Sequence, residues 1–92
     1  MPKINKVKNK VILVIPAYNE EKTIGNLIKK SRHYCDEILV VSAEKATDNT
    51  RKIAKSLGCK VLIDNGKGKG AGMRLAIESV KEGIIVFMDA DG

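Results

Sequence analysis

Short apolar clusters alternate with longer amphipathic stretches along this chain. Four clusters are rich in Val, Ile and Leu, as expected of strands that are buried on both faces of a parallel sheet. These predicted strands are Val11–Pro16, Glu37–Ser42, Lys60–Asp64 and Ile84–Asp89. Between them, apolar residues recur at helical spacing and predict helices. The predicted helices cover about Glu20–His33, Asp48–Leu57 and Lys69–Lys81.

Each predicted helix has one apolar stripe, which we expect to face the sheet. The stripes consist of Ile24, Leu27, Ile28 and Ser31 in the first helix, Ile53, Ala54 and Leu57 in the second, and Ala71, Leu75, Ala76 and Val80 in the third. Between the elements, Pro16 lacks an N–H group and is expected to end the first strand. Asn19 or the pair Thr47–Asp48 can accept hydrogen bonds from the amides that open a helix. Gly58 and Gly83 follow helices, where a left-handed residue is expected.

The strand–helix–strand repeat predicts the fold class. Its short connections give right-handed crossovers and a parallel sheet. We predict an α/β fold with three layers (α/β/α), built on a Rossmann-like sheet of about four strands in the order 3-2-1-4, by analogy with half of a doubly wound sheet. Residues 11–92 are expected to form this one domain, and residues 1–10 a basic N-terminal tail.

Composition limits the classes of protein to which the chain can belong. It has 92 residues, of which 43% are hydrophobic, and this favours one folded domain over disorder. No apolar run approaches the roughly 20 residues of a membrane-spanning helix, and the basic N-terminus lacks the apolar segment of a secretory signal. Cys35 and Cys59 are too few for a disulfide framework and are interpreted as reduced thiols. These features predict a cytoplasmic protein.

The net charge of +6 does not by itself indicate nucleic acid as a partner. The lysines are scattered over the tail, the helix faces and the segment Lys67–Lys69. Too few aromatic residues accompany them to form a stacking platform for bases, so we expect no nucleic-acid partner. A basic surface suits an anionic ligand, or anionic headgroups at the inner face of a membrane, where the protein would attach peripherally.

The predicted topology indicates where a ligand binds. In an open parallel sheet, ligands bind beyond the carboxyl ends of the strands, at the point where the strand order reverses. With the order 3-2-1-4, this point lies between the first and fourth strands. The segments there are Pro16–Glu20 and Asp89–Gly92, and both are rich in polar groups directly after an apolar strand.

Asp89 and Asp91 lie one residue apart at the end of the fourth predicted strand. Two carboxylates this close repel each other unless a cation neutralises them. Mg²⁺ and Mn²⁺ prefer such hard oxygen ligands and also bind the phosphates of nucleotides. The alternative is a strand-ending turn with exposed acids, but the position of the pair favours a Mg²⁺ or Mn²⁺ site.

Tyr18 and Glu20 follow the first predicted strand into the same region. A tyrosine ring can stack on a base, and Glu20 can accept hydrogen bonds from a base or a ribose. Glu20 and Glu21 also suit the start of a helix without any ligand. The glycine-rich segment Gly66–Gly72 lacks the Gly-Lys-Ser/Thr ending of a Walker loop. It is either an anion-binding segment at the start of the third helix or a flexible surface loop.

Five segments occur in the order in which a known family has them. They are Val14–Glu21, Asp36–Val41, Thr47–Thr50, Gly68–Ala71 and Ile85–Gly92. Together they resemble the nucleotide-sugar glycosyltransferases of family 2, which have the GT-A fold. Within this family, the chain resembles polyprenyl-phosphate (dolichyl-phosphate) mannosyl or glucosyl transferases and glucosyl-phosphoglycerate synthases. The resemblance implies that the chain is the N-terminal, donor-binding half of a GT-A fold.

The resemblance also implies roles for the matched residues. The implied donor-binding residues are Pro16, Ala17, Tyr18 and Glu20 at the nucleoside, Val41 in the base pocket, Lys69 near the phosphates, Asp89 at the ribose or the metal, and Ala90, whose backbone would approach the nucleotide. Asp91, together with Asp89, would bind the metal on the diphosphate.

The chain departs from the family pattern in two places. The stretch Ser42–Ala46 is one residue longer than the usual Asp-Asp-Gly-Ser, so Glu44 would replace the usual base-binding aspartate. The chain also ends at Gly92, directly after the predicted metal ligands. In the family, the acceptor site and the catalytic base lie further along, and no residue here is assigned as the base.

The expected function is that of a glycosyltransferase donor half. It would bind a UDP- or GDP-linked sugar for inverting transfer to a lipid phosphate or phosphoglycerate, with the metal stabilising the departing diphosphate. The alternative is a catalytically inactive nucleotide-binding or assembly module, which the missing acceptor half favours. A nucleotidyltransferase is less consistent, because Pro16–Asn19 is not a glycine- and arginine-rich phosphate loop. The exposed edge of the fourth strand also predicts self-association.

Overall fold

Strands and helices alternate along the chain in the computed structural model, which describes residues 10–65, 71–80 and 83–88. The elements are β1 (Val11–Ala17), α1 (Ile24–Ser31), β2 (Glu37–Ala43), α2 (Thr50–Ser56), β3 (Lys60–Asp64), α3 (Ala71–Ser79) and β4 (Ile84–Phe87). All the predicted strands and helices are present. Within the described ranges, no helix has the length and apolarity needed to cross a membrane.

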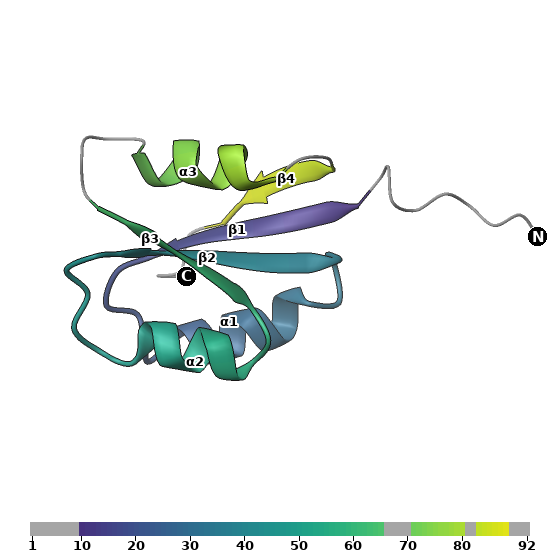
Figure 1. Ribbon diagram of the computed structural model, residues 1–92. Helices are drawn as coiled ribbons and strands as arrows, with labels where there is room; N and C mark the ends of the chain where they lie inside the picture. The colour runs from purple at the N-terminus through teal and green to yellow at the C-terminus, as the bar shows by residue number, and fades with distance from the viewer. Residues whose placement is uncertain (1–9, 66–70, 81–82, 89–92) are drawn as a thin grey trace, which may run out of the picture.

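The strands form one parallel sheet with the order β3-β2-β1-β4, as predicted (Figure 1). The central strand β1 pairs with β2 from Ile12 to Ala17 and with β4 from Val11 to Val14. The chain therefore reverses its direction of winding between β1 and β4. In a sheet of this kind, the carboxyl ends of these two strands flank the expected ligand site.

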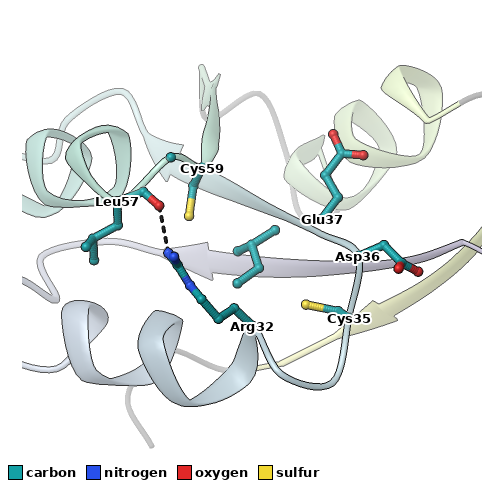
Figure 2. A pocket seen from close by; sticks show the side chains of 8 residues that line it. Arg32, Cys35, Asp36, Glu37, Leu57 and Cys59 are labelled. Carbon is teal, nitrogen blue, oxygen red and sulfur yellow. Dashed lines mark hydrogen bonds between the residues drawn. The ribbon is translucent and has the colours of Figure 1, made fainter.

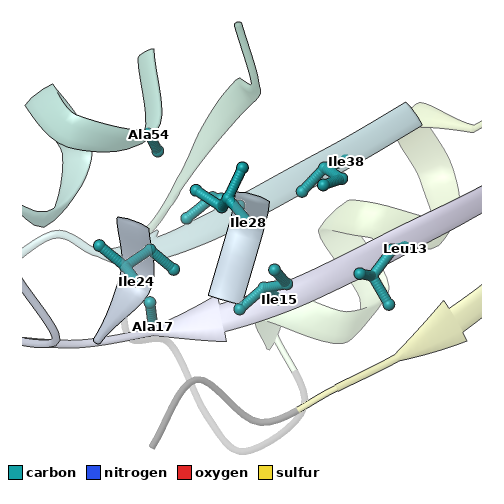
Figure 3. Close-up of a cluster of buried hydrophobic side chains, with 8 residues drawn as sticks. Leu13, Ile15, Ala17, Ile24, Ile28, Ile38 and Ala54 are labelled. Carbon is teal, nitrogen blue, oxygen red and sulfur yellow. The ribbon is translucent and has the colours of Figure 1, made fainter. Parts of the chain in front are cut away.

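Helices cover both faces of the sheet, with α1 and α2 on one side and α3 on the other (Figure 1). Successive side chains of a strand point to opposite faces, so β1 contributes to two apolar clusters. The cluster under α1 and α2 contains Leu13, Ile15, Ala17, Ile24, Ile28, Ile38, Val40 and Ala54 (Figure 3). The cluster under α3 contains Ile12, Val14, Leu39, Val41 and Ala76. The predicted α/β/α layering is confirmed.

The predicted helix stripes face the sheet. Ile24, Ile28 and Ser31 of α1, Ala54 of α2 and Ala76 of α3 are buried, and Leu27, Ile53, Leu57 and Val80 pack against the clusters. The helices are shorter than predicted. The Glu20 carbonyl accepts hydrogen bonds from the amides of Thr23 and Ile24, so Glu20–Thr23 form a turn and α1 begins at Ile24. Helix α2 begins at Thr50, because Asp48 and Asn49 belong to the preceding loop.

Pro16 does not end β1, which continues to Ala17. The Met88 N–H donates to the Val14 carbonyl (3.0 Å), and the next bond of a parallel ladder would come from the amide of residue 16. Proline has no such N–H. The described pairing with β4 runs to Val14 opposite Phe87, while pairing with β2 continues to Ala17 opposite Ser42. Pro16 therefore offers no N–H group toward β4 at the carboxyl end of β1.

The edge strand β4 supports the predicted self-association. In the described sheet it pairs with β1 alone, and residues 84–88 are uncharged. Ile84 and Val86 are 52% and 43% exposed. Because an open, apolar edge tends to pair with another strand, we expect the chain to dimerise with rising concentration. Val86→Lys should keep it monomeric in sedimentation experiments, whereas a wild-type chain that is monomeric at every concentration would contradict this expectation.

Candidate functional site

The carboxyl ends of β1 and β4 lie at the same end of the sheet, because the two strands are parallel. Beyond β1 the chain continues through Tyr18, whose side chain is 51% exposed. Beyond β4, Met88 is hydrogen-bonded to Val14 of β1. The fourth strand therefore ends beside the strand that leads to Tyr18, as the strand order required. Four predicted site residues, Lys69, Asp89, Ala90 and Asp91, lie outside the described residues.

Hydrogen bonds join the β1–α1 loop to the β2–α2 loop. The Glu20 N–H donates to Thr50 Oγ1 (2.8 Å), and the Glu21 N–H donates to Asp48 Oδ2 (3.0 Å). In the opposite direction, the Asn49 N–H donates to Glu21 Oε1 (3.0 Å). The Thr50 N–H and hydroxyl both donate to Asp48 Oδ1 (3.0 and 2.6 Å). Each loop is therefore both donor and acceptor to the other.

Asn19 adds a further link between the same loops. Its Oδ1 accepts hydrogen bonds from the amides of Thr47 and Asp48 (3.0 and 3.3 Å). Asn19 thus binds the neighbouring loop and does not cap the helix that follows it. Asp48 does accept from an amide at the start of α2, as predicted. We call the hydrogen-bonded residues Asn19–Glu21 and Thr47–Thr50 the two-loop network.

The two-loop network borders a hollow of about 370 Å³ that is lined by Asn19, Glu20, Glu21, Lys22, Thr23 and Asp48. Its walls are polar, with carboxylates and one lysine. The hollow opens at the carboxyl end of the sheet, directly beyond β1. Its position agrees with the topological expectation for a ligand site.

The other predicted contact residues are divided between the two faces of the sheet. Ala17 is buried under α1 and α2, whereas Val41 is 4% exposed and belongs to the cluster under α3. A Cβ on Gly72 would lie 3.1 Å from the Val41 side chain, so the first turn of α3 covers it. Glu44 is exposed beyond β2, and its N–H donates to the Asp64 carbonyl (2.8 Å). Pro16 and Ala17 lie at the end of β1, and Tyr18 and Glu20 lie in the loop that follows it. Val41 lies on the opposite face of the sheet from Ala17.

Asp48 has a lowered pKa. Loss of hydration raises the pKa of this carboxyl group, but the hydrogen bonds from Thr50 and from the Glu21 backbone outweigh it and hold the pKa below the ordinary value of 3.8. These donors favour the charged carboxylate. The negative form of Asp48 is therefore the one that holds the two loops together.

This pKa shift predicts how stability depends on pH. Because the folded-state pKa lies below the unfolded-state value, the Asp48 carboxylate stabilises the fold above about pH 3.8, and this contribution is lost as the pH falls through the folded-state pKa. Asp48→Asn should therefore destabilise the chain at neutral pH, and the difference from the wild type should shrink as the pH falls below 3.8 and through the folded-state pKa. Urea unfolding across this range measures it, and a difference that does not vary with pH would contradict the assignment.

A second hollow, of about 450 Å³, lies at the opposite end of the sheet (Figure 2). Arg32, Cys35 and Cys59 are among the residues that line it, and Arg32 Nη2 donates to the Leu57 carbonyl (2.7 Å). Burial raises the pKa of both thiols, and the charge of Asp36 also raises that of Cys35. Protonated thiols are poor nucleophiles. This hollow at the amino ends of the strands therefore lacks both the expected position and an activated group.

The described residues contain no group of three or more His, Cys, Asp or Glu side chains that could hold a metal ion. The predicted metal ligands, Asp89 and Asp91, follow Met88 directly in sequence and lie outside that part of the chain. Their role as metal ligands stays a prediction.

Residues 12–92 match the family model described as Glycosyl transferase family 2. The chain belongs to this family. It is 32% identical to Glycosyltransferase AglJ of Haloferax volcanii, over 89% of this chain and 27% of that protein. It is 35% identical to a glucosyl-3-phosphoglycerate synthase of Petrotoga mobilis, over 89% of this chain and 30% of that protein.

This family 2 chain also resembles a solved structure. The glucosyl-3-phosphoglycerate synthase of Mycobacterium tuberculosis, in complex with Mn²⁺, uridine diphosphate and phosphoglyceric acid, superposes with a TM-score of 0.77 at 27% identity. The match covers 92% of this chain and 34% of that one. The chain thus spans about a third or less of the length of these three proteins.

Sequence reasoning missed the two-loop network. The segment Thr47–Thr50 was recognisable as a family motif, but its spacing does not reveal that Thr50 and Asp48 bind the backbone of a loop that lies 27 to 30 positions away. The feature of the sequence that could have indicated this network is the presence of short polar side chains directly after two neighbouring strands, β1 and β2. Such side chains readily bond to backbone amides.

Proposed function

We propose that this chain is the donor-binding part of a nucleotide-sugar glycosyltransferase that transfers the sugar with inversion. The observation that carries the proposal is the position of Tyr18 and Glu20. They directly follow β1, next to the end of β4, where the strand order of the sheet reverses. Membership of glycosyl transferase family 2 supports the same activity.

The nucleoside would bind at the turn after β1. Tyr18 is exposed enough to stack its ring on a base or ribose, and Glu20 offers a carboxylate to hydroxyl or amide donors. Pro16 and Ala17 would contribute backbone contacts, and Glu44, just beyond the end of β2, would border the base. Val41 is buried under α3, so a contact of its side chain with the base stays a prediction from the resemblance. Since Glu44 stands where an aspartate is usual, we expect it to influence the choice between a UDP- and a GDP-linked donor.

The diphosphate would bind through a divalent metal held by Asp89 and Asp91. Their oxygens are the ligands that Mg²⁺ and Mn²⁺ prefer, and the related M. tuberculosis synthase was solved with Mn²⁺ and uridine diphosphate. The bound ion would supply charge neutralisation at the departing diphosphate. Asp89 would also contact the ribose, Ala90 would approach the nucleotide by its backbone, and Lys69 would lie near the phosphates.

The acceptor in our proposal is phosphoglycerate or a lipid phosphate. The relatives named above include a glucosyl-3-phosphoglycerate synthase, and one structure holds phosphoglyceric acid. A turnover assay with both acceptors and with UDP- and GDP-linked sugars would detect the released nucleoside diphosphate. Because no catalytic base is assigned in this donor-binding part, turnover is expected of a protein that also contains an acceptor part, and donor binding without turnover by such a protein would favour a binding module.

Isothermal titration calorimetry tests donor binding directly. We expect UDP or GDP to bind saturably in the presence of Mn²⁺ and much more weakly in EDTA, because the metal links the protein carboxylates to the diphosphate. Absence of binding for every nucleoside diphosphate in the presence of Mn²⁺ would overturn the proposed function.

A further inference from the structure

The two-loop network depends on an acceptor-only group at position 48. Both oxygens of Asp48 accept hydrogen bonds: Oδ1 from the Thr50 N–H and hydroxyl, and Oδ2 from the Glu21 N–H. A carboxylate satisfies this arrangement because it has no proton to donate. An asparagine would turn an NH₂ group toward one of these donors, so it would break the link although its size is nearly the same.

Thr50 extends the network to Glu20. Its side chain is fully buried, and its hydroxyl group donates its single proton in a hydrogen bond to Asp48 Oδ1 (2.6 Å). The lone pairs of the same oxygen are therefore left to accept the Glu20 N–H (2.8 Å). Asp48 thus sets the direction of the Thr50 hydroxyl, and Thr50 in turn fixes the backbone of Glu20.

A simpler contact of the same kind lies at the far end of the sheet. Asp36 Oδ2 accepts a hydrogen bond from the Val11 N–H (2.7 Å), which joins the start of β1 to the loop before β2. Each aspartate binds a backbone amide that lies 25 or more positions away in the sequence. Only the Asp48 contacts reach the loop that contains Tyr18 and Glu20. Asp36 is therefore a matched control for general stability.

We propose that Asp48 and Thr50 are positioning residues, which hold the backbone of Glu20 and Glu21 so that Tyr18 and Glu20 meet the donor nucleoside in one fixed orientation. This inference rests on the proposed donor-binding function. A loop that is ordered before binding loses less conformational freedom when the ligand arrives. Loss of the network should therefore weaken nucleotide binding beyond any loss of stability.

The test compares four variants by calorimetry with UDP and Mn²⁺, at a temperature where thermal unfolding curves find each of them folded. Asp48→Asn and Thr50→Val should lower the affinity by about 10-fold or more, because the binding loop must then be ordered at the expense of binding energy. Thr50→Ser keeps the hydroxyl and should bind within about 3-fold of the wild type. Asp36→Asn should lose stability and keep its affinity.

A second readout follows the loop without nucleotide. The chain has two tyrosines and no tryptophan, so a Tyr34→Phe background leaves Tyr18 as the sole reporter of tyrosine fluorescence. Its anisotropy should fall in Asp48→Asn and Thr50→Val and stay constant in Asp36→Asn. Unchanged anisotropy and affinity in folded Asp48→Asn would overturn the inference. If the wild type binds no nucleotide, the proposed function fails, and with it the role of the network in donor binding. A lower anisotropy of Tyr18 in Asp48→Asn and Thr50→Val would still show that the two-loop network orders the loop that contains Tyr18.

Discussion

Replacing Asp91 by alanine is expected to lower the affinity for UDP in the presence of Mn²⁺ by at least about 100-fold, because even the outer partners of metal ligands are worth about 10- to 100-fold in metal affinity. Asp91 is one of the two carboxylates that we assign to the metal. Without it, one anionic ligand would face both the ion and the diphosphate. Calorimetric titration of the folded variant measures this loss directly.

The same titration in EDTA provides the control for Asp91→Ala. If Asp91 acts only through the metal, the wild type and the variant should bind UDP with equal, weak affinity once the ion is removed. The effect of the substitution and the effect of the metal would then not be additive, as expected for two groups that act together. A variant that binds UDP like the wild type in Mn²⁺ would contradict the metal assignment.

The second large effect is expected at Gly83, where alanine should destabilise the fold by about 2–5 kcal/mol. Gly83 has φ +119°, and an added Cβ would lie 2.7 Å from the Lys10 carbonyl oxygen and 2.9 Å from Ile12 Cδ1. That oxygen accepts the Ile84 N–H (2.7 Å), so it cannot move without disturbing the first bond between β1 and β4. Urea unfolding of Gly83→Ala measures the loss.

Gly58 is the matched control for this prediction. It also has a positive φ, +87°, but an added Cβ would meet nothing within 4 Å. Gly58→Ala should therefore cost only the backbone strain, about 1–2 kcal/mol. Equal losses for the two variants would mean that the contacts at Gly83 do not matter.

The sheet order and the layers could be predicted from the sequence because they depend on patterns that extend over several residues. The apolar strands alternate with helices whose stripes include Ile24, Ile28 and Ala54, and short connections allow few topologies. The glycines at 58 and 83 were recognisable for a similar reason, since a left-handed residue commonly follows a helix. Both have a positive φ in the structure.

Features that depend on individual hydrogen bonds could not be predicted in this way. Pro16 lacks the N–H group that would face β4 but stays paired with Val41 of β2, and which neighbour loses a bond depends on the register. The bonds from Glu20 to Thr50 and from Glu21 to Asp48 join residues from separate motifs. The burial of Val41 under α3 likewise follows from how closely Gly72 approaches the sheet. The metal ligands Asp89 and Asp91 stay predictions from the motif and the family.

Paramagnetic broadening of backbone amide signals by Mn²⁺ in the presence of UDP tests the central claim, that the nucleotide binds between the ends of β1 and β4. We expect strong, nucleotide-dependent broadening at Tyr18, Glu20 and Met88. Signals at Cys35 and Gly58, at the opposite end of the sheet, should stay sharp. Broadening centred on Cys35 and Gly58, or none that depends on UDP, would contradict this placement of the nucleotide.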